Sequence, residues 1–67
     1  MRVNLPAHWI AHLRALPESG MGYQRVTVRL HDGRTFKDAL VLNAEQLEVK
    51  DVVELKPNEI AEITVEP

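Results

Sequence analysis

Residues 23–42 read Tyr-Gln-Arg-Val-Thr-Val-Arg-Leu-His-Asp-Gly-Arg-Thr-Phe-Lys-Asp-Ala-Leu-Val-Leu, and this stretch decides the fold. Polar and apolar residues alternate from Arg25 to His31, which is the period of a strand with one solvated and one buried face. Asp32-Gly33 follows and is typical of a type I′ turn, whose two central residues need positive φ. Residues 34–42 then return as a second strand. The stretch therefore predicts an antiparallel β-hairpin.

Residues 5–16, upstream of the hairpin, have the spacing of an amphipathic helix. The apolar side chains recur every three or four positions, at Leu5, Trp9, Ile10, Leu13 and Leu16. Pro6 suits the first helical position, where its missing N–H costs nothing, and Pro17 ends the pattern. Because so short a helix is marginal in water by itself, we expect its Trp9 face to dock on the sheet.

Three more short strands are predicted after the hairpin. Residues 43–45 form a turn, a third strand covers 46–49 and a fourth covers 52–55. A polar turn with one helical turn around Asn58 then leads to a fifth strand over 62–66. Because flat sheets leave edges that pair with other chains, we expect this sheet to curl.

The predicted fold class is therefore mainly β. We expect a small, strongly bent five-stranded antiparallel barrel of SH3-like size, with an N-terminal α-helix. The whole chain, residues 1–67, is predicted to be one domain, with the helix over 5–16 and the barrel over 22–66.

The composition limits the classes of function. A chain of 67 residues has a thin core, for which self-association is a usual source of stability. There is no cysteine, which excludes disulfides, thiolate metal ligands and a cysteine nucleophile. The longest apolar run, residues 39–42, is far too short to span a bilayer, and Pro6 and Arg14 interrupt any signal-peptide pattern. We expect a cytoplasmic protein that does not bind membranes.

The net charge of −2 hides an uneven distribution along the chain. Residues 1–37 carry six Lys or Arg against two acids, a balance of +4, whereas residues 38–67 carry two Lys against eight acids, a balance of −6. This distribution has two possible consequences. The two oppositely charged halves support head-to-tail contacts between copies, or strands from the two halves interleave and the opposite charges cancel within one molecule.

The hairpin and the strand after it resemble the Sm-like family. The residues that match its first motif are Val26, Val28, Leu30, Asp32-Gly33-Arg34, Phe36, Leu40, Leu47 and Val49. Asp38 stands where the family has a bend glycine, and residues 43–46 replace its longer RNA-binding loop. The Arg-Gly signature of the second motif is absent from residues 58–65. The resemblance implies an Sm-like (SH3-like) barrel and RNA or DNA as a partner. The whole chain also resembles short bacterial proteins with no assigned activity.

The candidate nucleic-acid site is a basic face on the hairpin. Arg25 and Arg29 share the outer face of the first strand, with Arg34 beyond the turn and Tyr23 at the start as a stacking aromatic. The alternative to a binding site is that these arginines are ordinary charged side chains at outward-facing strand positions. Overall acidity also argues against high affinity, since neutralisation of phosphates dominates such binding.

Metal binding and catalysis have little support in the sequence. His8 and His12 have the i, i+4 spacing of two metal ligands, with His31 as a possible third, but a fourth ligand and a neighbouring general base are missing. Ser19 is the one serine and lacks a nucleophile motif. We therefore expect no metal, no cofactor and no enzymatic activity.

The leading hypothesis is a small interaction or assembly module that binds itself or another protein through strand edges. Residues 52–55 of one copy are expected to pair with residues 62–65 of another. The residues of this predicted oligomer edge are Val52, Val53, Leu55, Ile63 and Val65. Nucleic acid is the less favoured partner.

Overall fold

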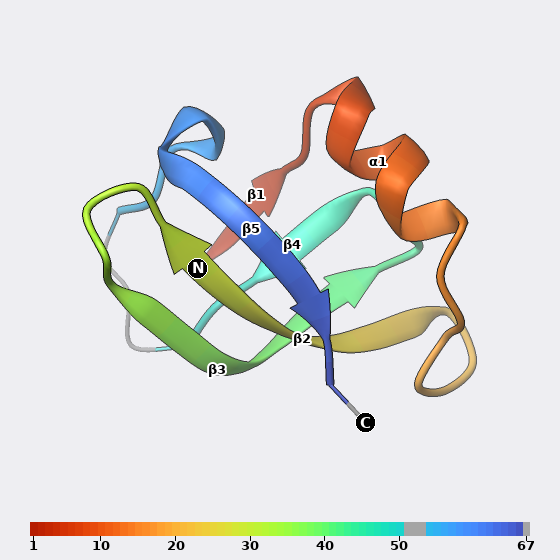
Figure 1. Ribbon diagram of the computed structural model, residues 1–67. Helices are drawn as coiled ribbons and strands as arrows, with labels where there is room; N and C mark the ends of the chain where they lie inside the picture. The colour runs from red at the N-terminus through yellow and green to blue at the C-terminus, as the bar shows by residue number, and fades with distance from the viewer. Residues whose placement is uncertain (51–53, 67) are drawn as a thin grey trace.

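The structure is a computed structural model that describes residues 1–50 and 54–66. Its elements are β1 (Arg2–Asn4), α1 (Ala7–Arg14), β2 (Tyr23–Leu30), β3 (Thr35–Leu42), β4 (Gln46–Glu48), the 3-10 turn η1 (Pro57–Glu59) and β5 (Ile60–Val65). The strands form one antiparallel sheet in the order β1-β4-β3-β2-β5 (Figure 1). The predicted mainly β class, with an N-terminal helix, is confirmed.

The predicted hairpin is confirmed as β2 and β3, but its turn is of another type. Leu30 N–H donates to the Arg34 carbonyl (2.8 Å), so three residues form the loop. Gly33 has φ 97°, whereas Asp32 is not at positive φ, which is the pattern of a three-residue turn and not of type I′. Asp32 accepts the Arg34 backbone N–H (3.0 Å), and this bond is the main cause of its lowered pKa.

A β-bulge interrupts the pairing of β2 with β3. Val26 lies opposite Ala39, but Val28 lies opposite Phe36, so β3 has one extra residue between these two pairs. Asp38, within the bulge, has φ 58°, in the left-handed region that Asp tolerates better than most residues. Bulges of this kind bend a strand and increase its twist.

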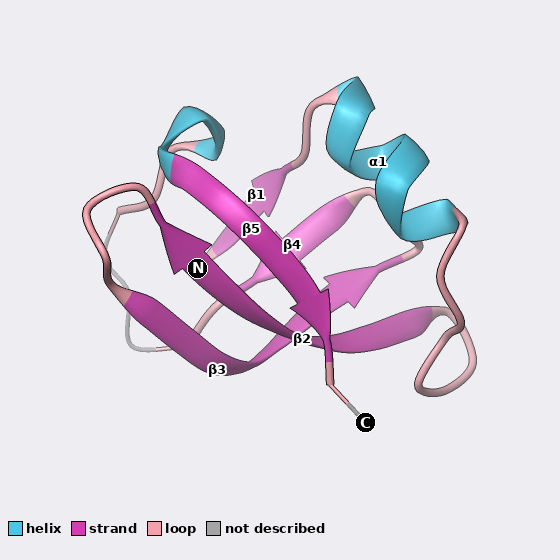
Figure 2. Cartoon of the chain, viewed as in Figure 1, coloured by secondary structure: helices cyan, strands magenta, loops and turns pink. Residues whose placement is uncertain are grey.

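The core lies on one face of the sheet, under α1. Alternate residues of β2 are buried from Gln24 to Leu30, as the sequence period predicts. Leu13 of α1 is buried, and Trp9 and Leu16 pack half-buried against the same cluster. The apolar helix face therefore docks on the sheet as predicted, and Figure 2 shows α1 packed beside the strands.

The helix is shorter than the predicted 5–16. Pro6 has an extended conformation (φ −70°, ψ 163°) and precedes the helix instead of occupying its first position. Leu5 N–H donates to the Glu45 carbonyl (2.8 Å), which holds Leu5 in line with β1. Leu5 is buried all the same, so its apolar character contributes to the core from outside the helix.

Strand β1 was not predicted. Val3 pairs with Leu47 of β4, and the N-terminal ammonium donates to the Val49 carbonyl (2.8 Å). Three residues are too few for a period to be visible in the sequence.

The strands after the hairpin match the sequence prediction in part. The turn at 43–45 is confirmed, with Asn43 and Ala44 both at positive φ. The third strand is confirmed as β4, and the helical turn and fifth strand as η1 and β5. The predicted fourth strand, with Val52 and Val53, falls largely on residues 51–53, outside the described residues. Leu55 is buried but lies in no strand.

The sheet is open where a strongly bent barrel was predicted. Strands β1 and β5 form its two edges, and within residues 1–50 and 54–66 no pairing joins them. The reason is that β1 covers the outer side of β4, while β5 pairs with β2 alone. In the same described ranges, no helix is long and apolar enough to cross a membrane.

Ion pairs between the two halves of the chain cancel the uneven charge. Four arginines of the first half each contact an acid of the second half. These pairs are Arg2–Glu48, Arg14–Glu45, Arg25–Asp38 and Arg29–Glu62, at N–O distances of 3.1, 3.3, 3.5 and 3.5 Å. Of the two outcomes left open by the sequence, the structure supports interleaving.

Candidate functional site

The predicted nucleic-acid residues do not form one patch. Tyr23 begins β2 and Arg34 follows its other end, so roughly 23 Å of strand separates them. Arg25 and Arg29 lie exposed between them, as predicted. Each of the three arginines has a carboxylate partner, and the tightest pair joins Arg34 Nε to Asp32 Oδ2 (2.8 Å).

Paired arginines offer phosphate less free positive charge than unpaired ones, and phosphate neutralisation dominates affinity for nucleic acid. RNA or DNA binding through this face therefore stays a prediction that the ion pairs do not favour.

Tyr23 is held by its neighbours. Its ring lies against Gly20, where an added Cβ would come within 2.5 Å of the ring carbon Cζ. Tyr23 is 36% exposed, so these neighbours cover it only in part. Met21, between the two loop glycines, is 99% exposed and contacts no core residue.

Strand β5 has one side with no paired strand. It is the last strand of the sheet and pairs only with β2 in the part of the chain that the structure describes. Glu66 N–H donates to the Arg25 carbonyl (2.8 Å). Because backbone groups alternate in direction along an antiparallel strand, the N–H and C=O of Ile63 and Val65 point away from β2. Two of the predicted edge residues thus present free backbone groups.

A cavity of about 560 Å³ lies along this free side of β5. Its lining includes Glu62 and Thr64 from one face of the strand and Ile63 and Val65 from the other. Because residues from both faces of β5 line the cavity, the cavity runs along the edge of this strand. Trp9 and Leu16 form the opposite wall together with His12. The cavity is therefore a groove between α1 and β5, which we call the β5 groove.

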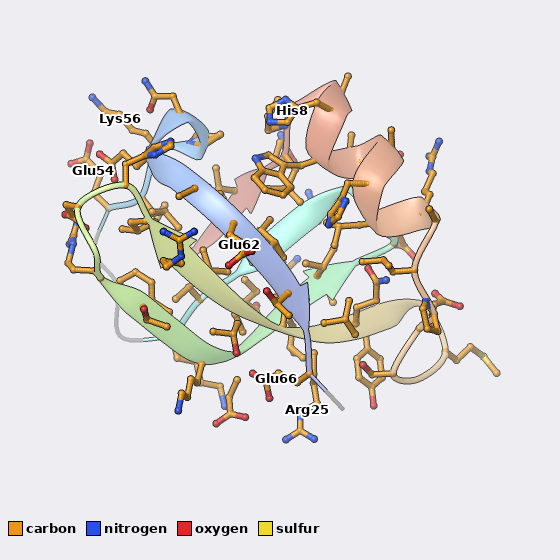
Figure 3. The ribbon with its side chains drawn as sticks, in the orientation of Figure 1. His8, Arg25, Glu54, Lys56, Glu62 and Glu66 are labelled. Atoms are coloured by element: carbon orange, nitrogen blue, oxygen red, sulfur yellow. The ribbon has the colours of Figure 1, made fainter. Side chains whose placement is uncertain are left out.

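The polar face of β5 is fixed by contacts within the chain. Glu66 Oε2 accepts the Asp38 backbone N–H (2.8 Å) and the Thr27 hydroxyl (3.1 Å). The bond from Asp38 is the main cause of the lowered pKa of Glu66, with contributions from Thr27 and the Arg25 charge. Figure 3 shows Glu66 beside Arg25, with Glu62 further along β5. These contacts hold β5 in place, so its free edge is preorganised for a partner.

Gln24 ties the groove wall to the sheet, and the sequence analysis missed it. Its side chain is 2% exposed, and its Nε2 group donates to the carbonyls of Leu13, Leu16 and Pro17 (3.0, 3.2 and 3.2 Å). These carbonyls lie at and just after the C-terminal end of α1, and the Leu13 carbonyl also accepts the Leu16 N–H (3.1 Å). Gln24 is two residues before the buried Val26 and therefore lies on the same face of β2. This spacing was the signal in the sequence that could have predicted its burial.

The histidines do not assemble into a metal site. His8 and His12 both lie against the Trp9 ring, with ring centroids 5.2 and 5.6 Å from it. His31 lies in the turn after β2, away from α1. Among residues 1–50 and 54–66, no group of three His, Asp or Glu side chains is placed to hold a metal ion.

Comparisons with known proteins add no family. Neither the protein-family models, nor the curated proteins, nor the solved structures contain a match to this chain. The β5 groove and the residues that support it are thus the evidence for function.

Proposed function

We propose that the protein is a non-enzymatic interaction module that associates with itself, or with another protein, by adding a strand to β5. The observation that carries the proposal is the unpaired side of β5 with a groove along it. Edge strands with free N–H and C=O groups are templates for pairing with another chain. In such strand addition, backbone hydrogen bonds supply affinity and side-chain contacts supply specificity.

The wall of the β5 groove suits a strand partner. Trp9 is half-buried and still lines the groove, so part of its ring is available to pack on an added strand. Aromatic anchors of this kind supply much of the binding energy at protein interfaces. Val52 and Val53, predicted as the partner strand, lie outside the described residues, and Leu55 is buried in its own chain. The proposal therefore rests on the β5 side of the contact.

We also propose that the fold belongs to the Sm-like group of SH3-like barrels, with the open side of β5 covered in the assembly. Three features support this proposal. The strands that follow the helix lie in the order β4-β3-β2-β5, and a 3-10 turn precedes the last strand. Asp38, at the position of the family's bend glycine, has a glycine-like φ of 58°. An open edge completed by a partner strand would reconcile this resemblance with the open sheet.

The experiment compares Val65→Pro with Val65→Ala. Proline removes the outward N–H, while alanine shortens the same side chain and keeps the N–H. We expect Val65→Pro to weaken association about tenfold or more, because each missing intermolecular hydrogen bond costs about 1 kcal/mol and the ring obstructs the partner. Light scattering over a dilution series gives the mass, and circular dichroism checks the fold. An equal mass for the wild type and the proline variant at every concentration would contradict self-association through β5.

A further inference from the structure

We infer that the strand added to β5 is β5 of a second copy, paired antiparallel about a two-fold axis at Ile63. The inference rests on the proposed function and specifies its partner and register. It follows from the direction of the backbone groups, from the positions of the glutamates on β5, and from the space beside the strand.

The two-fold axis limits the possible registers. In an antiparallel pair about such an axis, one residue lies opposite itself and its neighbours pair symmetrically. A bulge interrupts β5 at Ala61, because Arg29 pairs with Glu62 but Leu30 pairs with Ile60, so the regular stretch of β5 runs from Glu62 to Val65. An axis at residue 63 or at residue 64 pairs three residues of this stretch in each strand, and an axis elsewhere pairs fewer. An axis at residue 63 pairs Glu62 with Thr64, and an axis at residue 64 pairs Ile63 with Val65.

Charge decides between these two registers. An axis at residue 64 places Glu62 directly opposite Glu66 of the second copy, and like charges directly opposite are destabilising. An axis at Ile63 places Glu62 opposite Thr64 of the second copy, whose hydroxyl can donate to the carboxylate. Both side chains are exposed on the same face of β5, and the Glu62 carboxylate, which already contacts Arg29 of its own chain (3.5 Å), would be shared between this arginine and the hydroxyl. The Ile63 register therefore pairs the most residues without opposing two glutamates.

The backbone geometry agrees with the Ile63 register. Ile63 and Val65 carry the outward N–H and C=O groups, so Ile63 meets Ile63 of the second copy as a hydrogen-bonded pair. Glu62 and Thr64 then form non-hydrogen-bonded pairs, in which side chains of opposite strands come closest.

The β5 groove leaves the required edge accessible. It extends over all four residues from Glu62 to Val65, which includes the centre of the proposed pairing. Trp9 and Leu16 line the opposite wall of this groove and would contact the added strand.

The test reverses the charge at position 64. In the Ile63 register Thr64→Lys lies opposite Glu62 and should tighten the dimer, while Thr64→Glu should weaken it. Each effect is expected to be roughly two- to thirtyfold, since the symmetric dimer contains the pair twice. Dissociation constants come from sedimentation equilibrium at low salt. Thr35→Lys and Thr35→Glu, at an exposed threonine of β3, control for the change in net charge.

The outcomes separate the inference from the proposed function. Opposite effects of lysine and glutamate at position 64, absent at position 35, would support the Ile63 register. Weakening by both Thr64 variants would indicate an axis at residue 64 and overturn the inference. If neither Thr64 variant changes affinity while Val65→Pro lowers the mass, the second copy uses the edge in another register or with another segment, and the inference alone falls. If Val65→Pro also has no effect, the inference and self-association through β5 both fall.

Discussion

At the scale of single residues, Gln24 connects the helix to the sheet. Its amide group donates to three carbonyls at the end of α1. Gln24 occupies a buried position of β2, and the other buried positions of this strand are apolar. Its Oε1 atom is buried without a hydrogen-bond partner among the described residues. The reverse amide orientation would set this oxygen against three carbonyl oxygens, so the orientation is determined by the helix end.

Replacing Gln24 tests this connection. Gln24→Met keeps the volume and removes the donor, which should lower the free energy of unfolding by about 1–3 kcal/mol. Gln24→Glu replaces the donor by a charged acceptor beside three carbonyls and should cost more than the methionine variant. Urea unfolding followed by Trp9 fluorescence measures both. A methionine variant as stable as the wild type would contradict the role of the Nε2 donor.

Glu66 makes a pH-dependent contribution to stability. Its pKa is lowered from 4.5 in the folded protein, chiefly by the Asp38 backbone N–H, so the carboxylate is stabilised by folding. The contribution is fully present above the unfolded pKa and is lost as the pH falls through the folded pKa. Glu66→Gln should therefore lower the melting temperature at pH 7, and the difference from wild type should shrink towards pH 3. A difference that stays constant with pH would show that the charge of Glu66 plays no part.

At the scale of elements, the bulge in β3 depends on one left-handed residue. Asp38 makes an exposed ion pair with Arg25, which is worth little, but its φ of 58° is strained for most side chains. Asp38→Gly should keep or raise stability, whereas Asp38→Val should lower it by about 1–2 kcal/mol. Chemical denaturation of the two variants gives the comparison. If valine is tolerated as well as glycine, the bulge is not set by this residue.

The elements that could be predicted from the sequence are those in which the hydrophobic repeat continues over many residues. Eight residues of alternation define β2, and the repeat of apolar residues from Trp9 to Leu16 defines the helix face. Strand β1 was missed, and Leu5 was assigned to the helix, because both are positioned by backbone hydrogen bonds to residues forty or more positions away. The turn type was missed because Asp-Gly fits several turns, and the hydrogen bond from Leu30 to Arg34 selects among them.

The candidate site was predictable in part for the same reason. Ile63 and Val65 follow from the alternation of the last strand, and the structure places them at the sheet edge. The basic residues of β2, Arg25 and Arg29, were also placed correctly on the outer face, but their carboxylate partners come from β3 and β5. Such partners depend on strand order, which the local sequence does not contain.

At the scale of the whole molecule, interleaved charges leave the backbone edge as the main basis for the proposed association. The four ion pairs between the two halves remove the charge split that would drive head-to-tail contacts. Association through backbone hydrogen bonds and apolar contacts should therefore change little with salt, whereas binding of nucleic acid weakens steeply as salt rises.

Self-association through β5 is tested most directly by the absolute mass in solution, measured by light scattering over a wide concentration range at low and high salt. One chain has a mass of 7.6 kDa. We expect the mass to rise with concentration towards that of two chains, in both salt conditions, and to stay near that of one chain for Val65→Pro. A wild-type mass that remains at 7.6 kDa at the highest concentration would contradict self-association through β5.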